Sequence, residues 1–462
     1  NIFQLRGEHK LSENANHKIT WSSSYTIGKQ TTPDLRLFIN SFEDVAPGLL
    51  YLDAGGNDVT EDALALLADG ENLNEYFPGY TVDQIESDEL SYSIQDNLYP
   101  SPTRFYRKMY NTTLDLKFNY EKPIARDLGD DNKVAFGLSM VRRTRDYSEN
   151  RYSFVSQGVS YNGNPTDYFS SDNMSIIPGT SSGATNYIYL RDDTDIQNSY
   201  EASQSVLGGY AMMNISPTEN LKLNGGIRVE ATDMLLESDK LNDENLLPEL
   251  EQNFRGSLNV LDVLPSVNMT LKLAEQDLKV TNYRFSASQS VARPLFREKA
   301  PFSVFDFEIQ EQQTGNTALN RTKILNIDNR IEVFPGLREL LSLSVFYKHF
   351  TDPIEQVIIS TAANTEITWK NVESAQLYGI EFEAKKNLGF LSEKLSALNA
   401  AFNATYIQSA TSIAEDELLE IRATDPDHEE TRPMYGQSPY IINGILNLSL
   451  IHISEPTRLN PI

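Results

Sequence analysis

The sequence contains no cysteine, few basic residues and no long apolar run. The absence of cysteine among its 462 residues excludes disulfide scaffolds and thiolate metal sites. No run of 18 apolar residues occurs, which excludes a bilayer-spanning helix but leaves a membrane β-barrel open, because barrel strands alternate instead. Lys and Arg total 39 against 65 Asp and Glu, a net charge of −26. The chain therefore has no electrostatic footprint for phosphate backbones, and nucleic acid is excluded as a partner.

Long stretches of the sequence alternate between apolar and polar residues. In residues 221–231 the odd positions hold Leu, Leu, Gly, Ile, Val and Ala, while the even positions hold Lys, Asn, Gly, Arg and Glu. This period of two predicts a strand with one apolar and one polar face. The same pattern recurs in residues 114–121, 133–140, 267–273, 283–287, 341–347, 380–384, 398–406 and 442–450. Globular strands average about 5 to 6 residues, whereas a tilted membrane strand needs roughly 9 to 11, so the length of the pattern favours membrane strands.

The links between these segments alternate strictly in length. Short links are expected near residues 11–16, 122–132, 217–219, 275–281, 335–338 and 388–395. Long links are expected near residues 31–102, 149–198, 236–259, 294–320, 352–365 and 410–436. Tight periplasmic turns and large extracellular loops give an up-and-down barrel this asymmetry. The predicted fold class is therefore all-β, an antiparallel up-and-down transmembrane β-barrel.

The longest link, residues 31–101, looks like a folded extracellular insertion. It contains one predicted helix, with Thr60 as the N-cap, residues 63–68 as the body and Gly70 as the stop. Tyr76, Phe77 and Tyr80 follow among Asn and acidic residues, a composition suited to stacking on a carbohydrate or chelate ligand, and they are the candidate ligand-binding residues. The alternative is that these rings pack the loop against itself, which is the commoner fate of aromatics outside a pocket.

Patterns that could support catalysis or metal binding each lack their required context. Residues 179–183 match a nucleophile elbow, but they lie in a Ser-, Asn- and Gly-rich loop without the strand, turn and helix that expose the serine. The five histidines are scattered at spacings that form no ligand pair. The acidic clusters at 127–131 and 425–430 do not follow the twelve-residue calcium loop, so solvated turn charge is the simpler interpretation. We expect no enzyme activity, no cofactor and no metal site.

Several motifs together resemble the barrel of TonB-dependent outer-membrane receptors. The motifs are Gly225-Gly226-Ile227-Arg228-Val229-Glu230, Ser288 to Pro294 with Phe296-Arg297-Glu298 and Pro301-Phe302, Gly315-Asn316 before Arg321-Thr322-Lys323, Phe346-Tyr347-Lys348 with Asp352-Pro353-Ile354-Glu355, Tyr378 to Glu383, and Gly436 to Tyr440. Each motif alone is weak, and their combination and order are specific. The resemblance extends over nearly the whole chain, to about Ile451.

The resemblance implies a 22-stranded barrel in the bacterial outer membrane, filled by an N-terminal plug and energised by the TonB complex. About 13 strands are recognisable here, and no plug, TonB box or signal peptide is visible. We therefore expect residues 1–451 to be a partial barrel embedded in outer-membrane lipid, and residues 452–462, which resemble translated sequencing-adapter read-through, to be a non-native tail.

The function implied by the resemblance is uptake of a scarce, large ligand, such as a siderophore, cobalamin, a glycan or a peptide, by TonB-energised gating. The alternative from the barrel pattern alone is a passive porin or structural outer-membrane protein. A third alternative, an outer-membrane or secreted hydrolase, lacks a credible set of Ser, His and acid.

Overall fold

The structure is a computed structural model of the chain. It describes residues 1–11, 17–44, 48–68, 70–85, 90–94, 102–124, 132–175, 186–276, 279–306, 311–336, 339–360 and 365–448. The chain folds as two units: a wall unit of residues 1–31, 108–148 and 196–462, and an insertion unit of residues 32–107 and 149–195. None of the helices in the described ranges is long and apolar enough to cross a lipid bilayer.

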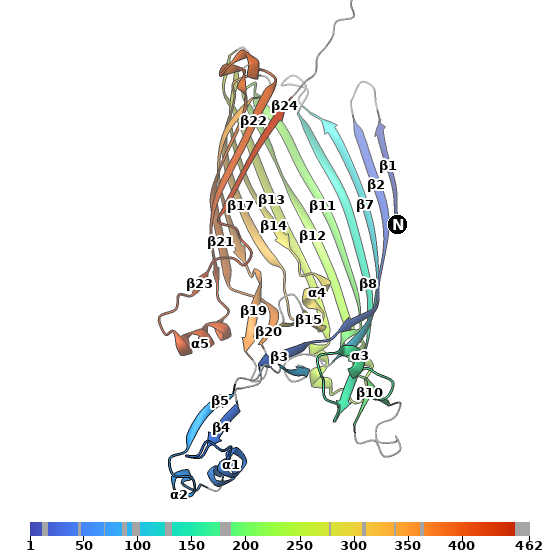
Figure 1. The fold of residues 1–462 in the computed structure, drawn as a ribbon. Helices are drawn as coiled ribbons and strands as arrows, with labels where there is room; N and C mark the ends of the chain where they lie inside the picture. The colour runs from blue at the N-terminus through green and yellow to red at the C-terminus, as the bar shows by residue number, and fades with distance from the viewer. Residues whose placement is uncertain are drawn as a thin grey trace, which may run out of the picture. The chain divides into compact units, whose positions relative to one another are not determined.

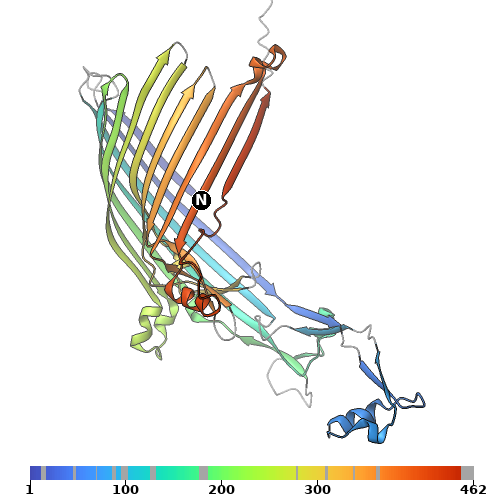
Figure 2. The same ribbon diagram turned by 90° about the vertical axis from the view of Figure 1, so that its left-hand side faces the viewer.

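Thirteen strands of nine residues or more form one large antiparallel sheet, in which consecutive long strands are neighbours. They are β1 (Ile2–Lys10), β2 (Lys18–Leu37), β7 (Thr103–Pro123), β8 (Lys133–Gln157), β11 (Tyr200–Thr218), β12 (Leu221–Ser238), β13 (Arg255–Gln276), β14 (Lys279–Ala292), β17 (Thr322–Phe334), β18 (Leu340–Thr351), β21 (Ser374–Asn387), β22 (Leu398–Ser412) and β24 (Tyr440–Leu448). Figure 1 and Figure 2 show the strands of the wall unit side by side in a curved sheet. The predicted up-and-down order is confirmed. Within the described residues, β1 pairs only with β2, and β24 only with β22.

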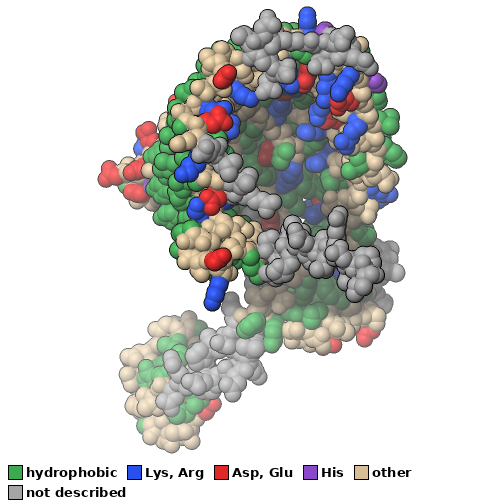
Figure 3. All heavy atoms as spheres, turned by 90° about the horizontal axis from the view of Figure 1, so that it is seen from above, with side chains coloured by type: hydrophobic (Ala, Val, Ile, Leu, Met, Phe, Trp, Pro, Cys, Tyr) green, Lys and Arg blue, Asp and Glu red, His purple; other side chains and the backbone are tan. Residues whose placement is uncertain are grey.

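The two faces of the wall unit differ as the alternation predicts. On the convex face, Ile331, Leu343 and Phe382 are cross-strand neighbours on β17, β18 and β21, and each is exposed. Large apolar side chains exposed in rows suit a lipid environment rather than water. Figure 3 shows hydrophobic side chains on the outer surface, whereas Lys, Arg, Asp and Glu gather on the hollowed face.

Links within the wall unit alternate between short and long, as predicted. The short ones span 11–17, 124–132, 219–220, 277–278, 335–339 and 388–397, and the long ones span 239–254, 293–321, 352–373 and 413–439. Because consecutive strands are antiparallel, the two sets lie at opposite ends of the sheet. Pro217 stands at a register shift just before the tight turn into β12, where a missing N–H is tolerated.

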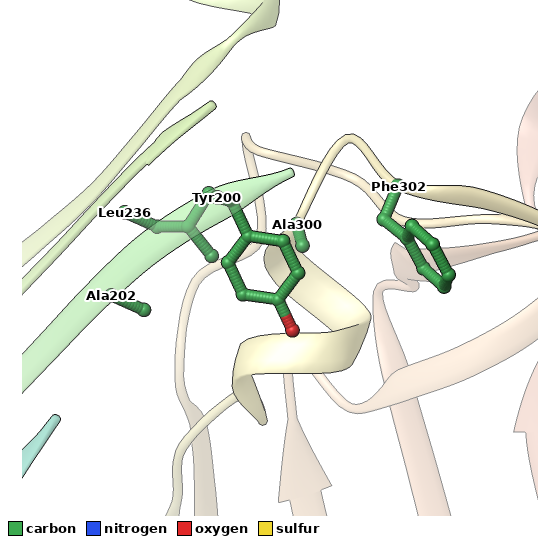
Figure 4. Close-up of a cluster of buried hydrophobic side chains, with 5 residues drawn as sticks. All are labelled: Tyr200, Ala202, Leu236, Ala300 and Phe302. Carbon is green, nitrogen blue, oxygen red and sulfur yellow. The ribbon is translucent and has the colours of Figure 1, made fainter. Parts of the chain in front are cut away.

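The long links 293–321 and 352–373 contain regular structure that the alternation pattern does not predict. Strands β15 (Ser303–Asp306), β16 (Glu311–Thr314), β20 (Thr365–Asn371) and β19 (Ile354–Ser360) form a second, four-stranded sheet, here called the loop sheet. Its strands of four to seven residues are too short to produce a visible alternation. The helix α4 (Phe296–Lys299) precedes it, and Ala300 and Phe302 pack with Tyr200, Ala202 and Leu236 of the wall in a buried cluster (Figure 4).

The other helices of the wall unit are short. They are α5 (Glu415–Thr424) and the 3-10 turns Ile196–Asn198, Asp239–Asn242, Pro248–Asn253, Leu388–Phe390 and Glu393–Leu395. The strand β23 (Thr431–Arg432) pairs with the end of β22. Arg432 donates to Glu417 of α5 at 2.5 Å, which fastens this helix to the sheet margin.

The described part of the insertion unit contains short strands and three short helices. It holds β3 (Asn40–Asp44), β4 (Gly48–Leu52), α1 (Thr60–Ala68), α2 (Leu73–Tyr76), β5 (Thr81–Ile85), β6 (Leu90–Ile94), α3 (Pro165–Tyr168), β9 (Met174–Ser175) and β10 (Tyr187–Asp192). The predicted helix and its stop at Gly70 are confirmed, with Gly70 at φ 77°. The predicted N-cap is wrong: Thr60 is already helical, its hydroxyl accepts from the Tyr51 N–H at 2.9 Å, and Asp58 accepts from the Thr60 N–H instead.

Candidate functional site

The concave face of the wall unit carries a partly buried group of five charged side chains near the long links, here called the loop-side network. Glu230 and Asp262 stand directly opposite each other on β12 and β13, an unfavourable pairing of like charges by itself. Arg228 and Arg293 contact Glu230 at 2.7 and 2.5 Å, and Arg321 contacts Asp262 at 2.6 Å. Three arginines thus surround two carboxylates, which stabilises both charges.

This network joins the long link 293–321 to the sheet. Arg293 follows the last residue of β14 and Arg321 precedes the first residue of β17, so the two residues bracket the link. Arg293 also donates to the Thr232 hydroxyl at 2.8 Å. Removing either carboxylate would leave a partly desolvated arginine without its ion-pair contact, which is costly. The network therefore fixes where the link, and the loop sheet inside it, leaves the wall.

A glycine makes room for the longest contact of the network. Arg228 on β12 reaches across β11 to donate to the Ser139 hydroxyl on β8 at 2.7 Å. Gly208 lies beneath it, and a Cβ atom there would stand 2.3 Å from the Arg228 guanidinium. In the same way Tyr210 crosses Gly137 to donate to Asn119 on β7 at 2.9 Å. These glycines are needed for close approach rather than for a turn.

A second charged group, the turn-side network, lies on the same face near the short turns. Glu332 accepts from Arg284 at 2.7 Å and from Arg330 at 3.3 Å. Arg330 also reaches Glu383 at 3.1 Å, and Lys385 pairs with Glu383 at 2.7 Å. The alternation predicts polar residues on this face, and these contacts extend from β14 across β17 to β21.

Two cations of α4 pack against the loop sheet and the residues next to it, the partly buried Arg297 and the buried Lys299. Arg297 lies over Phe302 at 4.6 Å and over Trp369 at 5.3 Å, while its N–H groups donate to backbone carbonyls. Lys299 is 1% exposed and donates to the carbonyls of Thr317 and Leu319. Burial lowers the pKa of Lys299 to about 8, because carbonyl dipoles replace water only in part.

Gly315, in one of the quoted motifs, lies against this buried region. A Cβ atom at Gly315 would come within 1.9 Å of the Ala300 carbonyl oxygen, so no larger residue fits. The next residue, Asn316, donates from its side chain to the Trp369 carbonyl at 2.9 Å. The Gly-Asn pair thus fastens β16 to both α4 and β20.

A cavity of about 630 Å³ opens on the concave face between the wall and α4. Its walls come from β7, β8, β11, β12 and residues 293–297. Arg143 and Arg145 of β8 line it together with Arg228 and Arg293 of the loop-side network. It is the candidate functional site, since it is concave, combines several arginines with an apolar lining, and is placed between the wall and a long link.

Some of these residues are predictable from the sequence, and others are not. Arg228 and Glu230 were predicted to lie on the polar face, and Arg293 and Arg321 fall within quoted motifs. Asp262 was missed, although a charge inside the apolar stretch 258–264 was a usable signal. Arg143 and Arg145 could not be distinguished from Arg142 and other strand charges, because only the folded cavity shows what they line.

The three candidate ligand-binding aromatics lie together in the insertion unit. Phe77 and Tyr80 pack against the buried cluster of Tyr51, Ala63 and Leu73, and the rings of Tyr80 and Tyr51 stack at 6.1 Å. Tyr76, at the end of α2, is 53% exposed. Of the three, Tyr76 presents its ring to solvent.

The remaining chemical motifs contribute little. Residues 179–183 and 127–131 lie outside the described residues. Asp425 accepts from His428 at 3.1 Å and Glu430 pairs with Arg422 at 3.4 Å, so two members of the second acidic cluster are used in local contacts. In the part of the chain that the structure describes, no group of three His, Asp or Glu residues is arranged to hold a metal ion.

Comparisons with known proteins point to one family. The family model described as TonB dependent receptor-like, beta-barrel, matches residues 24–447. A comparison with curated proteins found no match. The siderophore receptor PirA from Pseudomonas aeruginosa has a TM-score of 0.40 and 11% identity, covering 88% of this chain and 64% of that one. The ferric yersiniabactin uptake receptor FyuA from Yersinia pestis has a TM-score of 0.41 and 14% identity, covering 94% and 47%. This chain thus spans less than two thirds of either protein.

Proposed function

This chain belongs to the TonB-dependent receptor β-barrel family, and on that premise we propose that it forms the membrane wall of a bacterial outer-membrane receptor that imports a scarce, large ligand. The match over residues 24–447 is the observation that carries the proposal. The ligand would be a siderophore, cobalamin, a glycan or a peptide, and its passage would be gated by a plug domain and energised by the TonB complex. The chemistry is binding and gating, with no covalent step.

The two faces of the wall support this proposal. The convex rows of exposed apolar side chains suit outer-membrane lipid. The concave face carries the loop-side and turn-side networks, which suit contact with water, a plug or a hydrophilic ligand. Ion pairs in both networks join several strands to one another. The charged side chains that would line a polar lumen can therefore also hold the strands of the wall together.

Energised uptake can be tested by comparing four bacterial strains. The gene is present or absent, and TonB is active or inactive, in cells grown in a defined medium supplemented with a mixed panel of siderophores, cobalamin, glycans and peptides. We expect at least one compound to be depleted only when both gene and TonB are functional. Gene-dependent depletion that persists without TonB would instead establish a passive porin. No gene-dependent depletion of any compound would reject the receptor.

The insertion unit offers a separate test of ligand capture. Gly48 and Ile85 are backbone partners at the open end of the β4–β5 hairpin, so residues 49–84 can be replaced by a short Gly-Ser linker without stretching the chain. We propose that Tyr76, Phe77 and Tyr80 contribute to ligand capture there. The deletion is expected to reduce uptake while the amount of folded receptor in the outer membrane stays the same.

Single substitutions separate capture from packing. Tyr76→Ala removes an exposed ring and is expected to lower uptake without lowering the amount of folded receptor. Tyr80→Ala removes a ring that stacks on Tyr51 and packs against the buried cluster, so it is expected to lower the amount of folded receptor as well as uptake. Normal uptake by both the deletion and the Tyr76→Ala variant would show that this unit takes no part in capture.

A further inference from the structure

The cavity between the wall and α4 carries an excess of positive charge. Among its lining residues are five arginines, Arg143, Arg145, Arg228, Arg293 and Arg297, against the single carboxylate Glu230. A chain of net charge −26 therefore concentrates cations in one concave place. Because field lines are focused in clefts of one sign, such a place attracts anions even on an acidic protein.

The internal ion pairs do not account for this excess. Glu230 is already contacted by both Arg228 and Arg293. Arg143 instead donates to the Gln204 amide oxygen at 3.3 Å, and Arg145 to the Asn111 amide oxygen at 2.8 Å. Neutral acceptors of this kind orient a guanidinium without neutralising it, and each guanidinium has five N–H groups to donate.

Contacts within the protein also hold Arg143 and Arg145 in position. They are two residues apart on β8 and so share the face that also holds Ser139 and Val141 of the cavity lining. Arg145 lies 5.5 Å from the ring of Phe296, the first residue of α4. The loop-side network holds Arg293, which directly precedes the apolar lining residues Pro294, Leu295 and Phe296. These apolar residues are therefore fixed close to Arg143 and Arg145.

We propose that this cavity binds a small polyanion whose oxyanion groups, carboxylate or phosphate, are carried on a partly apolar frame. Arg143 and Arg145 would bind the oxyanions, since a guanidinium pairs with carboxylate or phosphate through two parallel hydrogen bonds. Pro294, Leu295 and Phe296 would contact the apolar frame. The inference names the ligand class for the uptake function proposed above, and its biological meaning rests on that function.

Binding is tested on the intact receptor purified in detergent, without the TonB complex, so the result does not depend on energised uptake. Isothermal titration calorimetry uses benzene-1,3,5-tricarboxylate, phenyl phosphate, and the neutral benzene-1,3,5-tricarboxamide as a matched probe of shape. We expect at least one of the two anions to bind at least tenfold more tightly than the triamide, and its affinity to fall as salt is raised. The tighter anion identifies carboxylate or phosphate as the preferred group. Equal binding of all three probes, or of none, would overturn the proposal.

Variants of β8 locate the site. The double variant Arg143→Gln with Arg145→Gln is expected to raise the Kd of the preferred anion at least tenfold. Arg142→Gln is the matched control: Arg142 directly precedes Arg143, so it lies on the opposite face of the strand, and it does not line the cavity. The Kd of this variant should change less than twofold. An unchanged Kd in the double variant, or an equal loss in the control, would overturn the assignment.

A conservative variant guards against misfolding as the cause of lost binding. Arg143→Lys with Arg145→Lys keeps both charges but not the planar guanidinium fork. It is expected to bind the anion with an affinity between those of the wild type and the double glutamine variant. Loss of binding in the lysine variant equal to that in the glutamine variant, with an unchanged β-sheet circular dichroism spectrum, would contradict charge-based recognition.

Discussion

At the scale of single residues, the concave face depends on glycines that let long side chains cross strands. Gly208 and Gly209 are adjacent on β11 but face opposite sides of the sheet. A Cβ at Gly208 would stand 2.3 Å from Arg228, whereas at Gly209 it would meet Leu138 at 3.4 Å. A Cβ atom would therefore clash with Arg228 on the concave face, whereas on the convex face it would make an ordinary contact with Leu138.

We expect Gly208→Ala to destabilise the intact receptor by roughly 1 to 3 kcal/mol, because Arg228 can no longer reach Ser139. Gly209→Ala should change the free energy of unfolding by less than about 0.5 kcal/mol. Urea unfolding in detergent measures both. In an Arg228→Ala background the cost of Gly208→Ala should disappear, as a double-mutant cycle requires of residues that act through one contact. A cost that persists in that background would show that Gly208 serves another purpose.

The buried Lys299 makes the stability of the loop sheet depend on pH. Its pKa falls from 10.5 to about 8 on folding, so between these values the unfolded chain binds a proton that the folded chain does not. Stability therefore rises with pH across this window, by roughly 3 kcal/mol in all, and the cost of the buried charge is fully present below pH 8.

Trp369 on β20 reports on this region, and Trp21 is the one other tryptophan in the sequence. In a Trp21→Phe background, the urea midpoint followed by Trp369 fluorescence should increase from pH 7.5 to pH 10. Lys299→Met, which keeps an unbranched side chain without a charge, should abolish this increase. A midpoint that rises equally in both proteins would assign the pH dependence to another group.

At the scale of elements, the sequence predicts the strands because their environment alternates with the same period as their side chains. Ile227 is 54% exposed on the convex face, and its neighbour Arg228 lies in the loop-side network, as the pattern of residues 221–231 predicts. Contacts between elements, by contrast, cannot be predicted from this alternation. Nothing in the spacing of Glu230, Asp262, Arg293 and Arg321 shows that they meet, since their proximity depends on the register of β12 and β13 and the path of a long link.

The loop sheet was missed for a related reason. Its pairing of β16 with β20 is parallel and joins residues about fifty positions apart, so no local pattern specifies it. Lys299 illustrates the same limit. From its position in a polar link we would predict a solvated side chain, and only the folded structure shows that it is buried. Strand phase was therefore predictable, whereas the cavity and its anchored link were not.

The phase of β12 can be measured directly, because the chain has no native cysteine to interfere. Single cysteines are introduced at Ile227 and Arg228 of the intact receptor, in which any cysteine outside residues 1–462 is replaced by serine. The variants are folded in lipid bilayers and treated with a lipid-soluble and a water-soluble maleimide. We expect Ile227→Cys to react with the first and Arg228→Cys with the second, since an arginine facing lipid at the midplane costs about 2 to 4 kcal/mol. Equal reaction of both sites with the water-soluble reagent would reject the assignment.

At the scale of the whole molecule, the wall unit has two sheet edges within the described residues. β1 pairs along one side with β2, and β24 pairs along one side with β22. All nine residues of β24 are exposed, including Ile442, Leu446 and Leu448. An unpaired edge inside hydrocarbon leaves backbone N–H and C=O groups without partners, at several kcal/mol for each group.

We therefore expect that residues 1–448, expressed and refolded alone in detergent, do not form a monodisperse monomer. The open edges should pair between molecules, because an exposed strand edge is a template for another strand. Size-exclusion chromatography with light scattering should show oligomers or aggregates, while circular dichroism still reports β-structure. Removing β24 from this protein should not prevent the association. The deletion would expose the edge of β22, whose residues 398–406 pair with β24. A heat-stable, protease-resistant monomer of residues 1–448 would show instead that these strands close upon themselves, and that the wall needs no further strand to satisfy its edges.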